Sequence, residues 1–274
     1  MKTSTQLKAL VRNLSKAKNV EAEIILRNFM LERILERVSV SDYKDSFILK
    51  VGMLIAAMVG IDTRTTMDMD ATIKGKTLSQ SEVSVFIENI LHIPINDGVS
   101  FTLRRIEEIR EEADYPGYRA SIEAILDKTR QTLKVDITTG DFVTPREIEY
   151  SFRLMFEDRV ISILAYNLET VLAEKLETII TRGVTTTRMR DFYDIFILTT
   201  TQSFDPEIFK AALKKTVEKR GTTEQMSDIE NVVKTITDNL ILIDLWQKYQ
   251  KKFTYAEDVS WGMAIDALNK LTQL

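Results

Sequence analysis

Cysteine is absent from this chain of 274 residues, and histidine occurs once, as His92. A chain without cysteine forms neither disulfides nor a thiolate metal site, and a single histidine cannot build a histidine-rich zinc centre. Any bound metal must therefore be held by oxygen ligands, which suits Mg²⁺ or Mn²⁺.

Long apolar runs and an excess of basic residues are also missing. The apolar run over residues 53–61 has about half the length that a membrane span requires, and polar residues interrupt the apolar pattern of residues 1–20. We therefore expect a cytoplasmic protein without a signal peptide or membrane segment. The formal net charge of −4 argues against a nucleic-acid coat protein but is compatible with a local basic groove.

The apolar periodicity changes twice along the chain. Residues 5–38 have helical spacing, residues 47 to about 163 mostly alternate, and helical spacing returns from residue 168. The alternating part predicts strands over 47–51, 65–73, 100–109, 118–126, 130–139, 147–152 and 160–166, with one helix over 81–93. The last part predicts helices over 169–182, 190–201, 206–220, 227–253 and 256–274. The sequence thus predicts an α+β protein: a mixed-sheet domain with a helical entry over 1–165, then a helical bundle domain over 166–274.

Two acidic residues, Asp68 and Asp70, stand two positions apart in the predicted strand 65–73. Side chains at that spacing in a strand share a face, and two carboxylates held so close repel each other unless a cation lies between them. A divalent metal, and hence phosphoryl chemistry, explains the pair. The alternative is a solvated strand face opposite the apolar Met67, Met69 and Ala71.

A glycine turn precedes this strand. Gly52 stands before a helix expected to begin at Met53, and the unpaired amides of a helix N-terminus suit a triphosphate. A turn without a ligand is the alternative interpretation. Arg64 and Thr66, just before the acidic pair, are candidate phosphate contacts, although Arg64 is equally compatible with a surface position.

Asp136 is a third candidate ligand. In the predicted strand 130–139, Leu133, Val135 and Ile137 form one face and Asp136 belongs to the other, polar one. Three carboxylates from two strands could hold two metal ions, one on the triphosphate and one lowering the pKa of an attacking hydroxyl. We interpret Asp141, which follows Gly140, as a turn residue.

The helical part has two further charged features. Lys175 stands beside the buried stripe of the predicted helix 169–182, where it could clamp a phosphate; a surface ion pair with Glu174 or Glu177 is the alternative. Asp191 and Asp194 are three positions apart at a helix start, so both project from nearly one side. Capping and salt bridges explain one of these two acids but not the whole charged cluster, which also includes arginines 188 and 190.

Taken in order, the motifs LKVGMLIAAMVG, RTTMDMD, LKVDITTGD, LAEKLETI and RMRDFYDI resemble the AbiEii/AbiGii nucleotidyltransferase toxins of bacterial abortive-infection and type IV toxin–antitoxin systems. These toxins belong to the DNA polymerase β-like nucleotidyltransferase superfamily. The resemblance covers residues 47–198. It implies a bilobed nucleotidyltransferase fold and an enzyme that uses a nucleoside triphosphate with Mg²⁺ or Mn²⁺.

The resemblance also assigns roles to particular residues. It implies that Asp68, Asp70 and Asp136 hold metal and that Lys175 and Asp191 complete the catalytic set. The nucleotide-binding residues that it implies are Lys50, Val51, Gly52, Arg64, Thr66 and Lys175. Asp194 is expected to support its helix.

The implied partners are a nucleoside triphosphate, with GTP favoured, an RNA acceptor such as transfer RNA, and a cognate antitoxin; we expect a monomer. Such a toxin would arrest translation and growth during phage infection. A non-catalytic nucleotide- or RNA-binding module, or a phosphotransferase toxin acting on a protein, are the alternatives. Basic residues suited to RNA, which solvation alone would also explain, are Arg104, Arg105, Arg110, Arg119, Lys128, Arg130, Lys134, Lys214, Lys215, Lys219 and Arg220.

One position departs from the family pattern, which has Lys-Gly-Gly where this chain has Lys50, Val51 and Gly52. A valine adds branched bulk where the backbone should approach phosphate, and it disfavours a positive φ. We therefore expect Val51 to weaken triphosphate binding relative to glycine.

Overall fold

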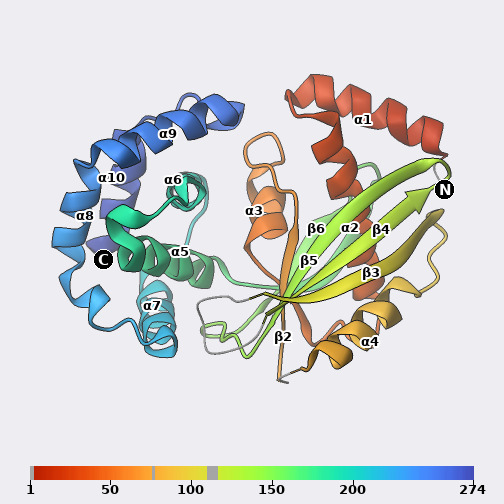
Figure 1. Ribbon diagram of the computed structural model, residues 1–274, viewed down its shortest axis with the longest axis horizontal. Helices are drawn as coiled ribbons and strands as arrows, with labels where there is room; N and C mark the ends of the chain where they lie inside the picture. Colours follow the sequence, from red (N-terminus) through yellow and green to blue (C-terminus); the bar gives the residue numbers. More distant parts are fainter. Residues whose placement is uncertain (1–2, 76–77, 110–116) are drawn as a thin grey trace. The chain divides into compact units, whose positions relative to one another are not determined.

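The computed structural model describes residues 3–75, 78–109 and 117–274 (Figure 1). Arg110, one of the candidate RNA contacts, lies outside these ranges. The chain divides into two compact units. The sheet unit comprises Met1–Asp141 and Glu147–Tyr166, and the helical unit comprises Phe142–Arg146 and Asn167–Leu274.

Within the described residues, the sheet unit is built on a seven-stranded mixed sheet with the order β3-β4-β5-β2-β1-β7-β6. Its strands are β1 (Phe47–Leu49), β2 (Met69–Ile73), β3 (Val99–Ile109), β4 (Gly117–Leu126), β5 (Thr129–Thr139), β6 (Ile148–Arg153) and β7 (Val160–Ala165). The β2–β5 and β1–β7 pairs are parallel, and the other pairs are antiparallel. The predicted mixed-sheet α+β class is therefore confirmed.

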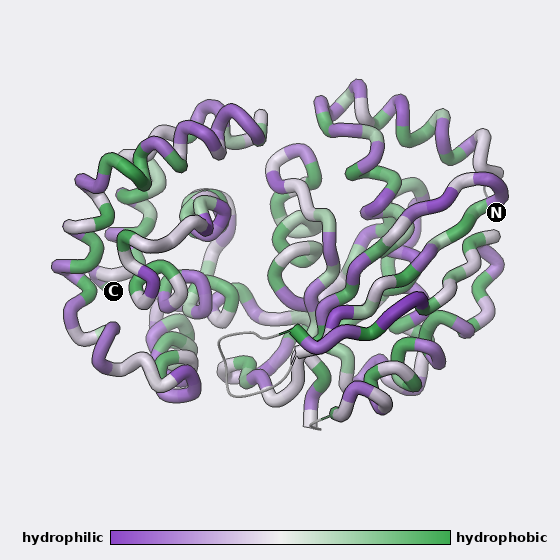
Figure 2. The backbone as a smooth tube through the Cα atoms, in the orientation of Figure 1, coloured by the Kyte–Doolittle hydropathy of each residue, from purple (hydrophilic) through white to green (hydrophobic). Residues whose placement is uncertain are grey.

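Helices of the sheet unit cover apolar residues of these strands. They are α1 (Ser4–Lys18), α2 (Ala22–Ser39), α3 (Val51–Val59) and α4 (Gln80–Leu91). Helix α2 packs against β5 and β7, and α4 packs against β3 and β4. The alternation in β5 explains this burial, because Leu133, Val135 and Ile137 all point to one face and are fully buried. Helix α3 is apolar along nearly its whole length (Figure 2).

The two elements next to the acidic pair differ from their predicted bounds. Helix α3 begins at Val51, two residues before the expected start. Strand β2 begins at Met69, so the prediction that Asp68 shares a strand with Asp70 is wrong. The Thr66 hydroxyl donates to the Asp68 carbonyl at 3.0 Å, a local hydrogen bond that competes with strand pairing before Met69.

The helical unit contains α5 (Leu168–Arg182), α6 (Met189–Thr201), α7 (Pro206–Arg220), α8 (Ile229–Thr237), α9 (Leu240–Lys252) and α10 (Trp261–Thr272). The predicted helix 227–253 is wrong as one element, because Asn239 interrupts it and caps α9 through hydrogen bonds from two backbone amides. Helix α10 starts only after Ser260, whose hydroxyl caps it by accepting a hydrogen bond from the Met263 amide at 3.2 Å. Nowhere in the described chain is a helix both long and apolar enough to cross a bilayer.

Candidate active site

Asp70 and Asp136 are neighbours on adjacent parallel strands. The β2–β5 register pairs Asp70 with Asp136 directly, and Asp68 lies in the bend that leads into β2. Burial raises the pKa of Asp70, the negative charges of Asp136 and Asp68 raise it further, and the cations Lys50 and Arg64 oppose this rise. Asp70 is thus a carboxylate whose ionised form a bound cation would stabilise.

Gly52 lies against these acids because it has no side chain. A Cβ added at Gly52 would stand 2.9 Å from the Thr66 hydroxyl oxygen and 3.1 Å from Oδ2 of Asp70. Such separations are too short for a carbon atom. Glycine therefore allows the first turn of α3 to approach the carboxylate of Asp70, and the predicted contact of Gly52 with a triphosphate stays a prediction.

Val51 is the first residue of α3. Among the described residues other than glycine, a positive φ occurs at Asn19 and Asp127 and not at Val51. The argument that valine conflicts with a positive φ at this position is therefore wrong, and only its bulk remains to weaken phosphate binding. Lys50 occupies the N-cap position without a side-chain hydrogen bond to the helix amides, which leaves the first turn without a side-chain cap.

Lys50 extends β1 toward the acidic residues. Its backbone N–H donates to the carbonyl of Asp70 at 2.8 Å, and its Nζ lies 2.9 Å from Oδ2 of Asp141 and 5.4 Å from the ring centre of Tyr166. Asp141 also accepts from the Thr138 hydroxyl at 2.6 Å. The sequence missed this role for Asp141; the glycine before it, which has a φ of 76°, was the available signal that the chain turns back on itself there.

Arg64 and Thr66 are buried residues of the segment that precedes β2. The Nη1 atom of Arg64 donates to the carbonyls of Gly52, at 3.3 Å, and Thr65, at 3.1 Å, so it ties the start of α3 to the segment before β2. The carbonyl of Thr66 accepts from the Asn28 side chain at 2.8 Å. Both residues therefore support the loop that carries Asp68, and their contact with phosphate stays a prediction.

Arg119 forms a two-pronged pair with Asp136. The β4–β5 register places the two residues opposite each other. Nε of Arg119 donates to Oδ1 at 2.8 Å, and Nη2 donates to Oδ2 at 2.6 Å. In the sequence, Arg119 is one of many basic residues suited to RNA, and no pattern there points to Asp136 as its partner. Its partner could be found only from the strand register, which the sequence pattern does not specify.

A metal site is compatible with this donor set but is not assembled from three acids. No group of three or more His, Asp or Glu side chains within the described residues is placed to hold a metal ion. Asp68 and Asp70 offer the oxygen ligands that Mg²⁺ or Mn²⁺ prefers. Asp136 faces Arg119 instead.

The helical unit holds a second charged cluster. Lys175 of α5 places Nζ 2.8 Å from Asp191 and 2.7 Å from Asp194, both on α6. All three side chains are buried, so the alternative of a surface pair for Lys175 is wrong. Glu174 and Glu177 face Arg220 instead. Arg188 adds a contact of 3.0 Å to the second oxygen of Asp191.

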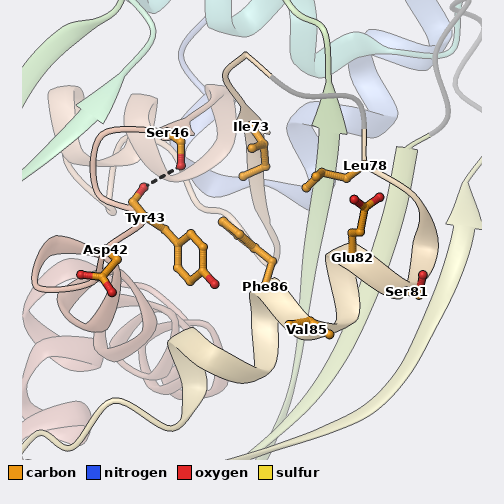
Figure 3. A pocket seen from close by; sticks show the side chains of 9 residues that line it. All are labelled: Asp42, Tyr43, Ser46, Ile73, Leu78, Ser81, Glu82, Val85 and Phe86. Atoms are coloured by element: carbon orange, nitrogen blue, oxygen red, sulfur yellow. Dashed lines mark hydrogen bonds between the residues drawn. The ribbon is translucent and has the colours of Figure 1, made fainter.

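A pocket of about 510 Å³ opens elsewhere in the sheet unit. The rings of Tyr43 and Phe86, with centres 4.5 Å apart, lie side by side in its wall (Figure 3). Ile73, at the opposite end of β2 from Asp70, also lines it. None of the predicted site residues belongs to its lining, so this pocket is separate from the acidic site.

Comparisons with known proteins give one family model and similar folds among solved structures. Residues 33–267 match the family model described as nucleotidyl transferase AbiEii toxin, type IV TA system. The fold is similar to that of JHP933 from Helicobacter pylori, with a TM-score of 0.54, 14% identity and coverage of 92% of this chain and 91% of that chain. The fold is also similar to that of a candidate nucleotidyltransferase from H. pylori, with a TM-score of 0.53 and 15% identity. That match covers 93% of this chain and 95% of the other chain. No curated protein matches the chain.

Proposed function

Because this chain belongs to the AbiEii family of type IV toxin nucleotidyltransferases, we propose that it transfers a nucleotide from a nucleoside triphosphate to an RNA acceptor. Membership of the family implies a nucleotide substrate and an antitoxin partner. The observation that carries the proposal is the close approach of Gly52, at the start of α3, to the carboxylate of Asp70. A helix N-terminus beside paired carboxylates suits a triphosphate bound with a divalent ion.

Each part of the sheet site has a role in the proposed reaction. The backbone amides at the start of α3 donate to phosphate oxygens, and Lys50 adds positive charge on the same side. Asp68 and Asp70 are the residues that would hold Mg²⁺. A bound Mg²⁺ neutralises phosphate charge and lowers the pKa of the attacking hydroxyl. Arg64 holds the start of α3 against the loop that carries Asp68, through hydrogen bonds to the carbonyls of Gly52 and Thr65.

The finer assignments rest on the family resemblance. GTP is the favoured nucleotide and transfer RNA the favoured acceptor, and the toxin acts in the cytoplasm to arrest growth during phage infection. Lys175 and Asp191 take part in the same reaction. In the helical unit, Nζ of Lys175 donates a hydrogen bond to Oδ1 of Asp191. Lys175 must therefore exchange this carboxylate for a phosphate group if it is to hold the phosphate of the substrate.

The test incubates the chain and its Val51→Gly variant with Mg²⁺, total RNA and each of the four α-labelled triphosphates in turn. One labelled RNA species is expected, with stronger labelling by Val51→Gly. Asp70→Asn should abolish labelling. Asp158→Asn, at a side chain that is 94% exposed, is the matched control and should label normally.

The outcomes separate the competing functions. If the unchanged chain and Val51→Gly both bind nucleotide but label no RNA, the chain is a non-catalytic binding module and the proposal is wrong. Label that enters protein from a γ-labelled triphosphate, with RNA unlabelled, would replace it with a phosphotransferase. The labelled RNA band and the preferred triphosphate together identify the acceptor and the nucleotide.

A further inference from the structure

The contact between Arg119 and Asp136 uses both oxygens of a carboxylate that lies beside the metal-binding pair. Arg119 reaches Oδ1 at 2.8 Å and Oδ2 at 2.6 Å, which is the planar two-bond geometry that arginine forms with carboxylates. A divalent ion that bound Asp136 would share both of its oxygens with the guanidinium of Arg119, and the two cations would repel each other. Arg119 is therefore already the cation that pairs with Asp136.

Arg119 is placed to act on the other acids as well. Asp136, which holds the guanidinium, is paired in register with Asp70 on β2, so the guanidinium lies next to the strand that carries Asp70. Its side chain is 35% exposed, whereas that of Asp136 is 12% exposed. The anchored arginine thus still faces solvent while the acid beneath it is buried.

The guanidinium keeps donors for a ligand. Its contact with Asp136 uses Nε and Nη2, and guanidinium carries five N–H donors in a fixed plane. Among the described residues, no hydrogen bond to Nη1 is present. That nitrogen is therefore able to donate to a phosphate oxygen without breaking the pair with Asp136.

We propose that Arg119, fixed by Asp136, supplies the positive charge that a second divalent ion would otherwise provide, so that this chain uses one ion, held by Asp68 and Asp70. Arg119 contacts the triphosphate, and Asp136 is a positioning residue that acts through Arg119. This inference rests on the proposed nucleotide substrate. It does not require that the acceptor be RNA.

The experiment counts bound Mn²⁺ by electron paramagnetic resonance of the free ion, with and without the non-transferable analogues α,β-methylene-GTP and α,β-methylene-ATP. The unchanged chain should bind one Mn²⁺ in both conditions. Arg119→Gln frees Asp136 and should add a second Mn²⁺ site, while the affinity for the analogue falls by about 10–100-fold, as expected for the loss of hydrogen bonds between charged groups.

Three further variants separate positioning from folding. Asp136→Asn should keep one Mn²⁺ yet weaken analogue binding, because Arg119 is no longer held. Arg119→Lys should recover part of the affinity, since it restores the charge without the planar fork. Arg104→Gln removes an exposed arginine paired with Glu123 on the same sheet and should change neither measurement.

Two Mn²⁺ ions in the unchanged chain, with one lost in Asp136→Asn, would overturn the inference. So would the absence of measurable analogue binding, or equal affinities in the unchanged chain and Arg119→Gln. Because neither readout involves transfer, one-ion binding that depends on Arg119 in a chain that labels no RNA would defeat the proposed function alone.

Discussion

The sheet unit and the helical unit each hold a cluster of acids and bases, but the two clusters differ in how far their charges are neutralised. In the helical unit, Lys175 is enclosed by Asp191 and Asp194, and all three are buried. In the sheet unit, burial raises the pKa of Asp70, and repulsion from Asp136 and Asp68 raises it further. Arg188, with Nε 3.0 Å from Asp191, is a second cation in the first cluster, so its two acids contact two cations, whereas we expect the second cluster to favour a cation from outside.

This difference should change how much stability is lost when one charged group is removed. A buried, balanced ion cluster is costly to disturb, because removal of one partner leaves the other charge without compensation. An unbalanced, partly exposed cluster should lose little stability when an acid is removed. The comparison therefore predicts opposite signs for the change in stability when one charged side chain is neutralised in each unit.

The largest effect is expected for Lys175→Met. This variant removes the buried cation that both Asp191 and Asp194 contact, so the free energy of unfolding should fall by about 3–5 kcal/mol. Urea denaturation of the purified chain measures it. Lys215→Met, at a 62% exposed lysine of the same unit, should change stability by less than about 0.5 kcal/mol.

A rescue sharpens the same test. Adding Asp194→Asn to Lys175→Met removes one of the two acids that contacted Lys175 and should restore part of the lost stability. If Lys175→Met is as stable as the unchanged chain, Lys175 does not hold the helical cluster together and the contrast between the units fails.

Next in size is Gly52→Ala in the sheet unit. The new Cβ would press on Thr66 and Asp70, and overpacking of this kind costs about 1–3 kcal/mol. Nucleotide binding should also weaken, because Asp70 must move. Gly262→Ala is the matched control: a helical glycine whose Cβ would meet only the Ser260 hydroxyl, at 3.8 Å, should tolerate alanine. Thermal unfolding and analogue titration of both variants check this, and equal behaviour would show that the start of α3 is not tightly packed against Asp70.

These sites also show how far the sequence could be interpreted alone. Alternation in residues 133–137 identified β5 and the polar face that carries Asp136, because a strand with one buried face repeats every second residue. The fold class followed from the same signal. By contrast, strand β2 begins after Asp68 because Thr66 makes a local hydrogen bond that no apolar periodicity predicts.

The partners of the charged residues were the least predictable part. Arg119 meets Asp136 only through the register of β4 and β5, and Asp141 reaches Lys50 only because the chain turns after Gly140. Both contacts join residues distant in sequence, so residue type and local spacing leave many partners open. The sequence identified the chemical groups of the site but not which of them are paired.

A smaller effect of opposite sign is expected for Asp70→Asn. The pKa of Asp70 in the folded chain lies above its ordinary value of 3.8, mainly through burial, so the folded state binds a proton more readily than the unfolded state. Stability from this group is therefore lost as the pH rises from 3.8 through the folded pKa. Asp70→Asn should be more stable than the unchanged chain at pH 8, within the range of about 0.5–3 kcal/mol usual for single substitutions, and the difference should disappear below pH 3.8.

Urea unfolding across this pH range, with and without Mg²⁺, measures the effect. Mg²⁺ should stabilise the unchanged chain at pH 8 and leave Asp70→Asn unaffected. Asp158→Asn, at a 94% exposed side chain, serves as the control without a pH-dependent difference. A less stable Asp70→Asn at pH 8 would mean that the sheet cluster, like the helical one, is balanced by its own cations.

The smallest effect on stability is expected for Val51→Gly. Glycine inside a helix costs about 0.5–1 kcal/mol relative to alanine, and position 51 is only the first residue of α3, so the loss should not exceed this range. Affinity for the triphosphate should nevertheless rise, because the branched side chain no longer stands where phosphate approaches the helix amides.

Val59→Gly, at the last residue of the same helix, provides the matched comparison: it should lower stability by a similar amount without changing the affinity. Equal triphosphate affinity and equal growth arrest for Val51→Gly and the unchanged chain would show that the bulk of Val51 does not limit the site, and that the open cluster of the sheet unit accommodates its ligand without a second glycine.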